Sequence, residues 1–195
     1  MNQAMIIESI VTTVSPQGQM NPAPMGITLL PTEQALQVRP YKTTHTYQNL
    51  LSTGVGVVNL SYDGSLFVYT AVGDPVLPGV PAEQVPGTVL VDCSWWEIEV
   101  ERMEDREERA LFTCRVVQEG QSGVVSGFNR AQAALVEGAI LASRPFLYEH
   151  SFLNQELDRL AAIITKTGGP REREALSFLL RYLRQFRGKV DGTNA

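Results

Sequence analysis

The sequence has few of the residues from which metal sites and disulfide frameworks are built. It contains two cysteines and two histidines in 195 residues. Cys93 and Cys114 are far apart, and no histidine stands near them at the spacing of a metal-binding motif. We therefore expect no metal ion, and we predict that both cysteines are reduced thiols buried in strands.

Basic residues and long apolar runs are also scarce. The chain has 16 Lys and Arg against 21 Asp and Glu, a formal net charge of -5, which argues against a nucleic-acid or anionic-membrane partner. No apolar run approaches the roughly 20 residues that span a bilayer, and no signal-peptide pattern opens the sequence. We expect a cytoplasmic protein with no membrane partner.

The spacing of apolar residues along the sequence changes near residue 127. Before it, segments rich in β-branched residues alternate with turns that contain Gly and Pro, which predicts antiparallel strands. Beyond it, apolar residues recur at helical spacing. We predict a β region over 1–126 and a helical region over 127–195. The predicted strands cover 5–14, 21–30, 35–38, 54–60, 66–71, 89–103 and 110–119.

The helical region is expected to contain a helix over 129–143 and a helical hairpin. The hairpin consists of 152–167 and of a helix that begins at Pro170, with a polar, frayed end over 188–195. Small residues on one face of 129–143 allow close packing. The sequence leaves open whether that face packs within its own subunit or against a partner.

A candidate anion site lies where a predicted strand runs into a short helix. Pro40 keeps Arg39 extended, Thr43 or Thr44 can cap the helix, and Gly54 can end it. The unpaired N–H groups of such a first turn suit a phosphate monoester, and Arg39 and the neighbouring lysine add positive charge. The alternative is an ordinary capped surface helix with solvated cations beside it.

Three other stretches carry expectations about exposure. Pro22 and Pro24 cannot donate to a ladder, so the strand that holds them must lie at an edge or a bulge. The four prolines of 73–87 predict an irregular loop. The acidic run 97–108 is expected to be a solvated face, and strict alternation would place Trp95 or Trp96 on that polar face.

Several segments together resemble the family called domain of unknown function four-four-seven. The resemblance rests on ESIVTT near Glu8, NPAPMG from Asn21, RPYKTTHTYQNL from Arg39, GFNRAQAALVEGAILASR from Gly127 and KTGGPRE from Lys166. The family is a branch of the FMN-binding split barrels, which include pyridoxamine-phosphate oxidases and flavin reductases. The resemblance implies an α+β, mainly β fold: a split β-barrel of Greek-key antiparallel strands with a C-terminal helical extension.

The resemblance also implies FMN as cofactor and a set of binding residues. The FMN phosphate would lie against residues after the third strand: Arg39, Tyr41, Lys42, Thr43, Thr44, Thr46 and Asn49. The ring edge would meet the backbone of the second strand at Asn21, Ala23, Met25 and Gly26. His45 stands where many relatives have Arg or Lys, so Lys42 and Arg39 would have to compensate.

The resemblance also covers Asn129 and Arg130. Met25 and Asn129 each have an ordinary structural alternative to a contact with the cofactor. Met25 can be a core thioether. Asn129 can simply cap a helix, although the resemblance makes a contact of Asn129 and Arg130 to the cofactor or across a dimer reasonable.

Two functions of different class remain, and no catalytic residue is identified. The first is an FMN-dependent oxidoreductase of flavin-reductase type with an unassigned substrate. The second is a non-catalytic FMN- or pterin-binding protein of one-carbon, methanopterin-linked metabolism. A structural protein with an empty barrel is a weaker third. The resemblance implies a homodimer with FMN near the interface.

Overall fold

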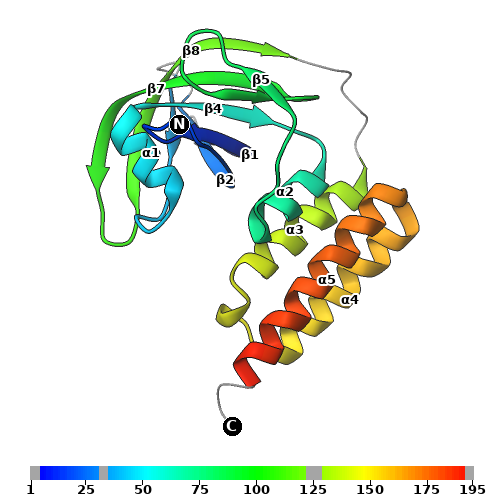
Figure 1. Cartoon of the computed structure of the whole chain (residues 1–195). Coiled ribbons are helices and arrows are strands. Elements are labelled where there is room, and N and C mark those ends of the chain that lie inside the picture. The colour runs from blue at the N-terminus through cyan, green and yellow to red at the C-terminus, as the bar shows by residue number, and fades with distance from the viewer. Residues whose placement is uncertain (1–4, 31–34, 122–128, 192–195) are drawn as a thin grey trace. The chain divides into compact units, whose positions relative to one another are not determined.

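A computed structural model describes the backbone of residues 5–30, 35–121 and 129–191. By their contacts the residues form two compact units, which we call the barrel unit (1–61 and 76–125) and the helical unit (62–75 and 126–195) (Figure 1). Residues 62–75 thus group with the helices, whereas the sequence placed a single division after residue 126. The predicted turn at 31–34 lies outside the described residues.

Six strands close the barrel, each antiparallel to its neighbours, in the order β1–β2–β3–β8–β7–β4. Their bounds are Met5–Val14 (β1), Met20–Leu30 (β2), Ala35–Val38 (β3), Val55–Leu60 (β4), Ser94–Asp105 (β7) and Ala110–Gln121 (β8). Alternate side chains fill the interior, since successive residues of a strand point to opposite faces. Val11, Ile27, Val58, Ile98 and Phe112 are among those core residues.

Neither cysteine forms a disulfide and both are buried, as predicted, but only Cys114 lies in a strand, because Cys93 stands just before the start of β7. Burial, together with nearby Glu101, raises the pKa of the Cys114 thiol to about 12. This thiol therefore stays protonated at neutral pH and is unreactive.

Glu97 is a buried carboxylate that holds the proline-rich segment. That segment contains a two-stranded ribbon, β5 (Gly79–Pro81) and β6 (Thr88–Leu90). Between the two strands, the N–H groups of Glu83, Gln84 and Val85 donate to the Glu97 carboxylate at 2.9, 2.7 and 3.0 Å. The expectation that Glu97 lies on a solvated face is wrong, because this segment covers it and leaves it 0% exposed.

Asn59 and Thr12 fasten the same ribbon to the barrel. The Asn59 side-chain oxygen accepts from the N–H of Leu90 at 2.8 Å, and its amide nitrogen donates to the Ile10 carbonyl at 3.1 Å. The Thr12 hydroxyl donates to the Thr88 carbonyl at 2.5 Å. Buried side chains thus bond the polar backbone groups of an irregular segment.

The two tryptophans occupy opposite faces of β7, and both are half-buried. Trp96 packs on the barrel core, and Trp95 packs on Val57, Val85 and Val89 beneath the proline-rich segment. The Trp95 ring also lies against Gly120, where an added Cβ would come within 2.3 Å of it. Neither indole is on an open polar face, because both faces of the strand are covered here.

The helical unit contains α2 (Gly64–Val72), α3 (Arg130–Ser143), the short 3-10 helix η1 (Pro145–Leu147), α4 (His150–Thr167) and α5 (Pro170–Asp191). The predicted strand over 66–71 is wrong, since these residues belong to α2. Asp63 caps this helix by accepting from the N–H of Ser65 at 3.0 Å. Packing of α2 on α3 and α5 overrides the β preference of its residues.

The small-residue face of α3 packs within its own chain, which settles the alternative that the sequence left open. Its buried residues include Ala134 and Gly138, and the helix packs on α2, α4 and α5. A Cβ added at Gly138 would lie 3.2 Å from a methyl group of Leu179. The last helix continues to Asp191, so residues 188–191 of the expected frayed end are helical.

We predict that Glu97→Gln destabilises the barrel unit by about 2–3 kcal/mol. The amide would place an N–H donor against backbone N–H donors and would remove the charge that strengthens three hydrogen bonds. Urea unfolding followed by tryptophan fluorescence measures this directly, because Trp95 and Trp96 both lie in the barrel unit. Glu99→Gln is the control, since Glu99 pairs with Arg115 at the surface. Equal midpoints for the two variants would contradict the role given to Glu97.

Candidate functional site

The first turn of α1 (His45–Thr53) forms as the sequence predicts. Thr44 is the N-cap, and its hydroxyl accepts from the N–H of Tyr47 at 3.3 Å and donates to the Tyr41 carbonyl at 2.7 Å. No described acceptor is within hydrogen-bond reach of the N–H groups of His45 and Thr46, which precede the first backbone bond of the helix, from Gln48 to Thr44. Both N–H groups are therefore without a described acceptor; His45 is exposed, whereas Thr46 is 1% exposed, and the Thr44 hydroxyl is engaged.

Gly54 ends the helix, as predicted. Its φ of 70° is in the left-handed region, and its N–H donates to the Leu50 carbonyl at 3.1 Å. The termination by glycine keeps α1 short and lets β4 begin at the next residue.

The segment before α1 is held by the turn between β7 and β8. The N–H of Lys42 donates to the Glu108 carbonyl at 3.1 Å, and the N–H of Ala110 donates to the Pro40 carbonyl at 3.2 Å. Between these bonds, Tyr41 forms an isolated antiparallel bridge with Arg109. The position of this segment therefore depends on a turn that lies far later in the chain. Local sequence patterns could not identify that dependence.

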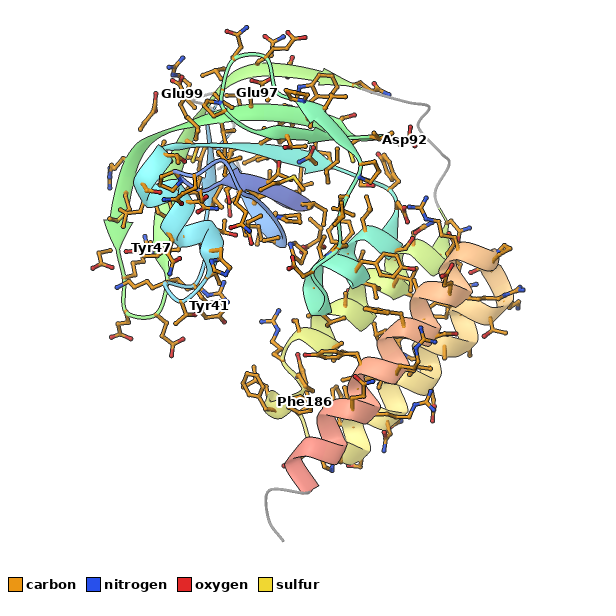
Figure 2. The ribbon with its side chains drawn as sticks, viewed as in Figure 1. Tyr41, Tyr47, Asp92, Glu97, Glu99 and Phe186 are labelled. Atoms are coloured by element: carbon orange, nitrogen blue, oxygen red, sulfur yellow. The ribbon has the colours of Figure 1, made fainter. Side chains whose placement is uncertain are left out.

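Three cations gather around this segment, and one of them was missed by the sequence analysis. Lys42 forms an ion pair with Asp105. Arg39 donates to the side chain of Gln37 at 3.1 Å. The missed cation is Arg109, whose guanidinium lies over the Tyr41 ring, 3.8 Å from its centre. Figure 2 shows Tyr41 beside the first turn of α1. The only signal for Arg109 was its place at the end of an acidic run.

Two side-chain hydrogen bonds fix α1 on the hairpin of β1 and β2. The Asn21 side chain donates to the Thr46 hydroxyl at 3.1 Å, and the Asn49 side chain donates to the Thr13 hydroxyl at 3.0 Å. Thr46 and Asn49 are buried. The structure thus brings Asn21, Thr46 and Asn49 together, with their side chains bonded to protein groups.

The outer edge of β2 is open over most of its length. β1 pairs with the whole strand, but β3 pairs only with its end, from Thr28 to Leu30. No described strand pairs with the residues from Met20 to Ile27 on that side. The predicted edge position of the Asn21–Gly26 stretch is confirmed.

The prolines determine which backbone groups this edge presents. Unbroken pairing with β1 across Pro22 and Pro24 requires the N–H groups of Ala23 and Met25 to point toward β1, since proline has none. The open edge therefore carries the carbonyls of Pro22 and Pro24 and both backbone groups of Gly26. It offers fewer donors than the sequence analysis expected from Asn21, Ala23 and Met25.

Two further predicted site residues have the ordinary roles that the sequence left open. Met25 packs its side chain on the barrel core. Asn129, in the helical unit, caps α3 by accepting from the N–H of Ala131 at 2.8 Å and donates to the Thr167 carbonyl at 3.2 Å. Arg130 is exposed. A cofactor contact by Asn129 or Arg130 stays a prediction.

Two hollows among the described residues do not suit a phosphate. One of about 500 Å³ in the barrel unit is lined by residues such as Leu29, Leu36, Trp96 and Val116 and by no cation. Another of about 250 Å³ in the helical unit is largely aromatic. No described group of His, Cys, Asp and Glu could hold a metal ion. No described helix is long and apolar enough to cross a bilayer.

Glu104, near the end of β7 and just before the turn that holds the segment preceding α1, has a lowered pKa. A hydrogen bond from Arg106, helped by Arg102, lowers the pKa of this carboxyl. Glu104 therefore stays ionised and is occupied by these two guanidinium groups. The charges of Arg102 and Arg106 are to that extent already balanced.

Comparison with known proteins matches almost the whole chain. The family model described as the N-terminal domain of protein of unknown function DUF447 matches residues 7–122, and the second model of that family matches residues 129–181. An FMN-bound protein of Methanosarcina mazei, described with the same family, is 22% identical, with a TM-score of 0.79 over 92% of this chain and 96% of that one.

Two solved structures with other names match the chain over a shorter length. Flavoredoxin from Methanosarcina acetivorans is 14% identical, with a TM-score of 0.54 over 66% of this chain and 77% of that one. Component B of nitrilotriacetate monooxygenase from Bacillus cereus is 19% identical, with a TM-score of 0.53 over the same shares, 66% and 77%. These likenesses confirm the predicted split-barrel fold, and the family models show that the chain belongs to the DUF447 family of proteins of unknown function.

Proposed function

We propose that the barrel unit binds FMN, with the phosphate at the first turn of α1 and the flavin ring along the open edge of β2. The Methanosarcina mazei protein of the same family is FMN-bound by its own description, and its fold matches over nearly the full length of both chains. The chemistry of the two places in this chain supports the same ligand.

The observation that carries the proposal is the hydrogen bond from Asn21 to Thr46. It joins the beginning of the open β2 edge to the first turn of α1 at 3.1 Å. A ligand with a phosphate at one end and a planar heterocycle at the other can therefore reach both places without leaving the barrel unit. Neither place alone would distinguish FMN from a simple anion or a simple heterocycle.

The donors at the first turn fit a phosphate. The donors are the N–H of exposed His45, the N–H of buried Thr46, which has no described acceptor, and the hydroxyl of exposed Thr43. Arg39 and Lys42 add two cations from the same segment. The helix end contributes roughly 0.3–1 kcal/mol for an anion, and each hydrogen bond to a charged group contributes about 1.5–3 kcal/mol. Several of these groups must therefore act together, and Lys42 must exchange Asp105 for the phosphate.

The edge of β2 fits the pyrimidine side of a flavin ring. That side presents an N–H donor between two carbonyl acceptors, and the edge offers carbonyls at Pro22 and Pro24 and both a donor and an acceptor at Gly26. The protein's contribution there is to bind and orient the ring. Bound FMN would itself supply the redox chemistry of a flavin-reductase-like oxidoreductase.

One observation favours a second candidate ligand at the same edge. Because the two prolines remove donors, the edge is richer in acceptors than in donors. A pterin carries an amino group beside its ring N–H and so presents more donors than a flavin does. The alternative function is thus a protein that holds FMN or a pterin without turnover, in one-carbon metabolism.

We further propose that the protein is a homodimer with FMN beside the interface. An open strand edge attracts pairing or needs cover, and the stretch from Met20 to Ile27 is such an edge in the part of the chain that the structure describes. A second copy that covers this edge would also shield a bound ring from water.

The first functional prediction concerns ligand preference. We expect FMN to bind more tightly than riboflavin by at least about tenfold, because a phosphate of charge near -2 meets two cations and several donors. Isothermal titration with FMN, riboflavin and a pterin would measure the three affinities. Equal affinities for FMN and riboflavin would remove the phosphate site, and tighter binding of the pterin would favour the alternative.

Substitutions of Lys42 and of Asp105 are expected to change the affinity for FMN in opposite directions. Lys42→Ala should weaken FMN binding about tenfold through loss of a charged hydrogen bond. Asp105→Asn should strengthen it about two- to fivefold, since it frees Lys42 from an exposed ion pair worth up to about 1 kcal/mol. Glu107→Gln removes the same charge from the same turn and is the control. If Asp105→Asn behaves like Glu107→Gln, competition for Lys42 is not what sets the affinity.

We expect dimer formation and FMN binding to depend on each other. A permanent dimer interface buries more than about 2,000 Å², so we expect one species of twice the chain mass in light scattering across dilution. FMN should be released where the dimer dissociates. A monomer that holds FMN with full affinity would contradict this arrangement.

A further inference from the structure

Arg109 is set apart from the other cations near α1 by what surrounds it. It belongs to the turn between β7 and β8; at the end of β7, Arg102 and Arg106 both pair with Glu104, and Asp105 pairs with Lys42. Arg109 forms no ion pair with a carboxylate of the described residues. Its positive charge is therefore the least compensated in this turn.

The Tyr41 ring already holds the Arg109 guanidinium in place. The guanidinium lies over the ring at 3.8 Å from its centre, and the two residues are also joined through their backbones. Stacking leaves the edge of the planar guanidinium, where its N–H groups lie, free to donate. A side chain held in this way loses less freedom when it binds an anion than a freely rotating lysine does.

The backbone of Tyr41 joins the pair to the cap of α1, where the phosphate is proposed to bind. The Tyr41 carbonyl accepts from both the N–H and the hydroxyl of Thr44, at 3.0 and 2.7 Å, and Thr44 is the cap of α1. Tyr41 is 40% exposed, so a ligand can approach the pair from solvent. The free first-turn N–H groups belong to the two residues that follow Thr44.

The acidic residues in and just before this turn do not cancel this charge. Glu104 is held by two arginines, and Asp105 pairs with Lys42 until that lysine turns to a bound phosphate. Glu107 and Glu108 are exposed. No ion pair joins either of them to Arg109 among the described residues, and exposed charges contribute little to one another, whereas a hydrogen bond from a guanidinium to a phosphate is charge-assisted at both ends.

We propose that Arg109, stacked on Tyr41, is a phosphate-binding residue that gives the site its preference for a phosphorylated flavin. This inference rests on the proposed function, because it assigns a role at the same site. It adds a residue from the β7–β8 turn to a site otherwise built from β2, α1 and the segment before α1. Preference for FMN over riboflavin would then depend on that turn.

The test compares Arg109→Gln with Arg106→Gln, which removes the same charge three residues away. Isothermal titration of each full-length variant with FMN and with riboflavin gives four affinities, which are compared with the two of the wild type. We expect Arg109→Gln to weaken FMN binding about tenfold or more and to leave riboflavin unchanged. Arg106→Gln should change either affinity by less than about twofold. Arg109→Lys, which keeps the charge and loses the planar fork, should lie between wild type and Arg109→Gln.

Three results would overturn the assignment. One is wild-type FMN affinity in Arg109→Gln, and another is an equal loss of FMN affinity in Arg109→Gln and Arg106→Gln. The third is a parallel loss of FMN and riboflavin binding in Arg109→Gln, which would mean that the residue only supports the fold. Failure of the proposed function is seen separately, in a wild-type protein that does not prefer FMN to riboflavin.

Discussion

Two prolines in β2 impose the constraint on which the proposed site depends. Without N–H groups, Pro22 and Pro24 can pair with β1 only in the orientation that turns their carbonyls away from it. β3 is too short to cover those carbonyls, so they stay on an open edge. The same hairpin then receives α1 through Asn21 and Asn49. The edge and the helix start are next to each other for this reason.

Side chains take over where regular pairing stops. The proline-rich segment cannot form a long strand, and Glu97, Asn59 and Thr12 bond its backbone instead. The segment before α1 is likewise held by backbone bonds to the β7–β8 turn and by the Tyr41–Arg109 stack. The barrel therefore fixes its irregular parts with a few buried or stacked side chains, and those side chains determine which polar groups stay available to a ligand.

The sequence predicted features whose signals are local, and it failed where the outcome depends on distant packing. Pro40, the capping threonine and Gly54 identified α1 because each acts on its own backbone. The residue types of 66–71 predict a strand, but these residues form part of helix α2, which packs against α3. The alternation of apolar and acidic residues predicts that Glu97 faces solvent, because no pattern near Glu97 indicates that another segment covers it. Arg109 was missed for the same reason: its partner Tyr41 lies far away in the chain.

The central claim is that one ligand contacts both the first turn of α1 and the open edge of β2. Amide chemical shifts of isotope-labelled protein, recorded with and without FMN, test it most directly. The account predicts that FMN moves the amide signals of Gly26, His45 and Thr46 together, and that riboflavin moves that of Gly26 while leaving the other two nearly unchanged. Shifts confined to the aromatic hollow around Phe146 and Phe186, with no change at these three amides, would contradict it.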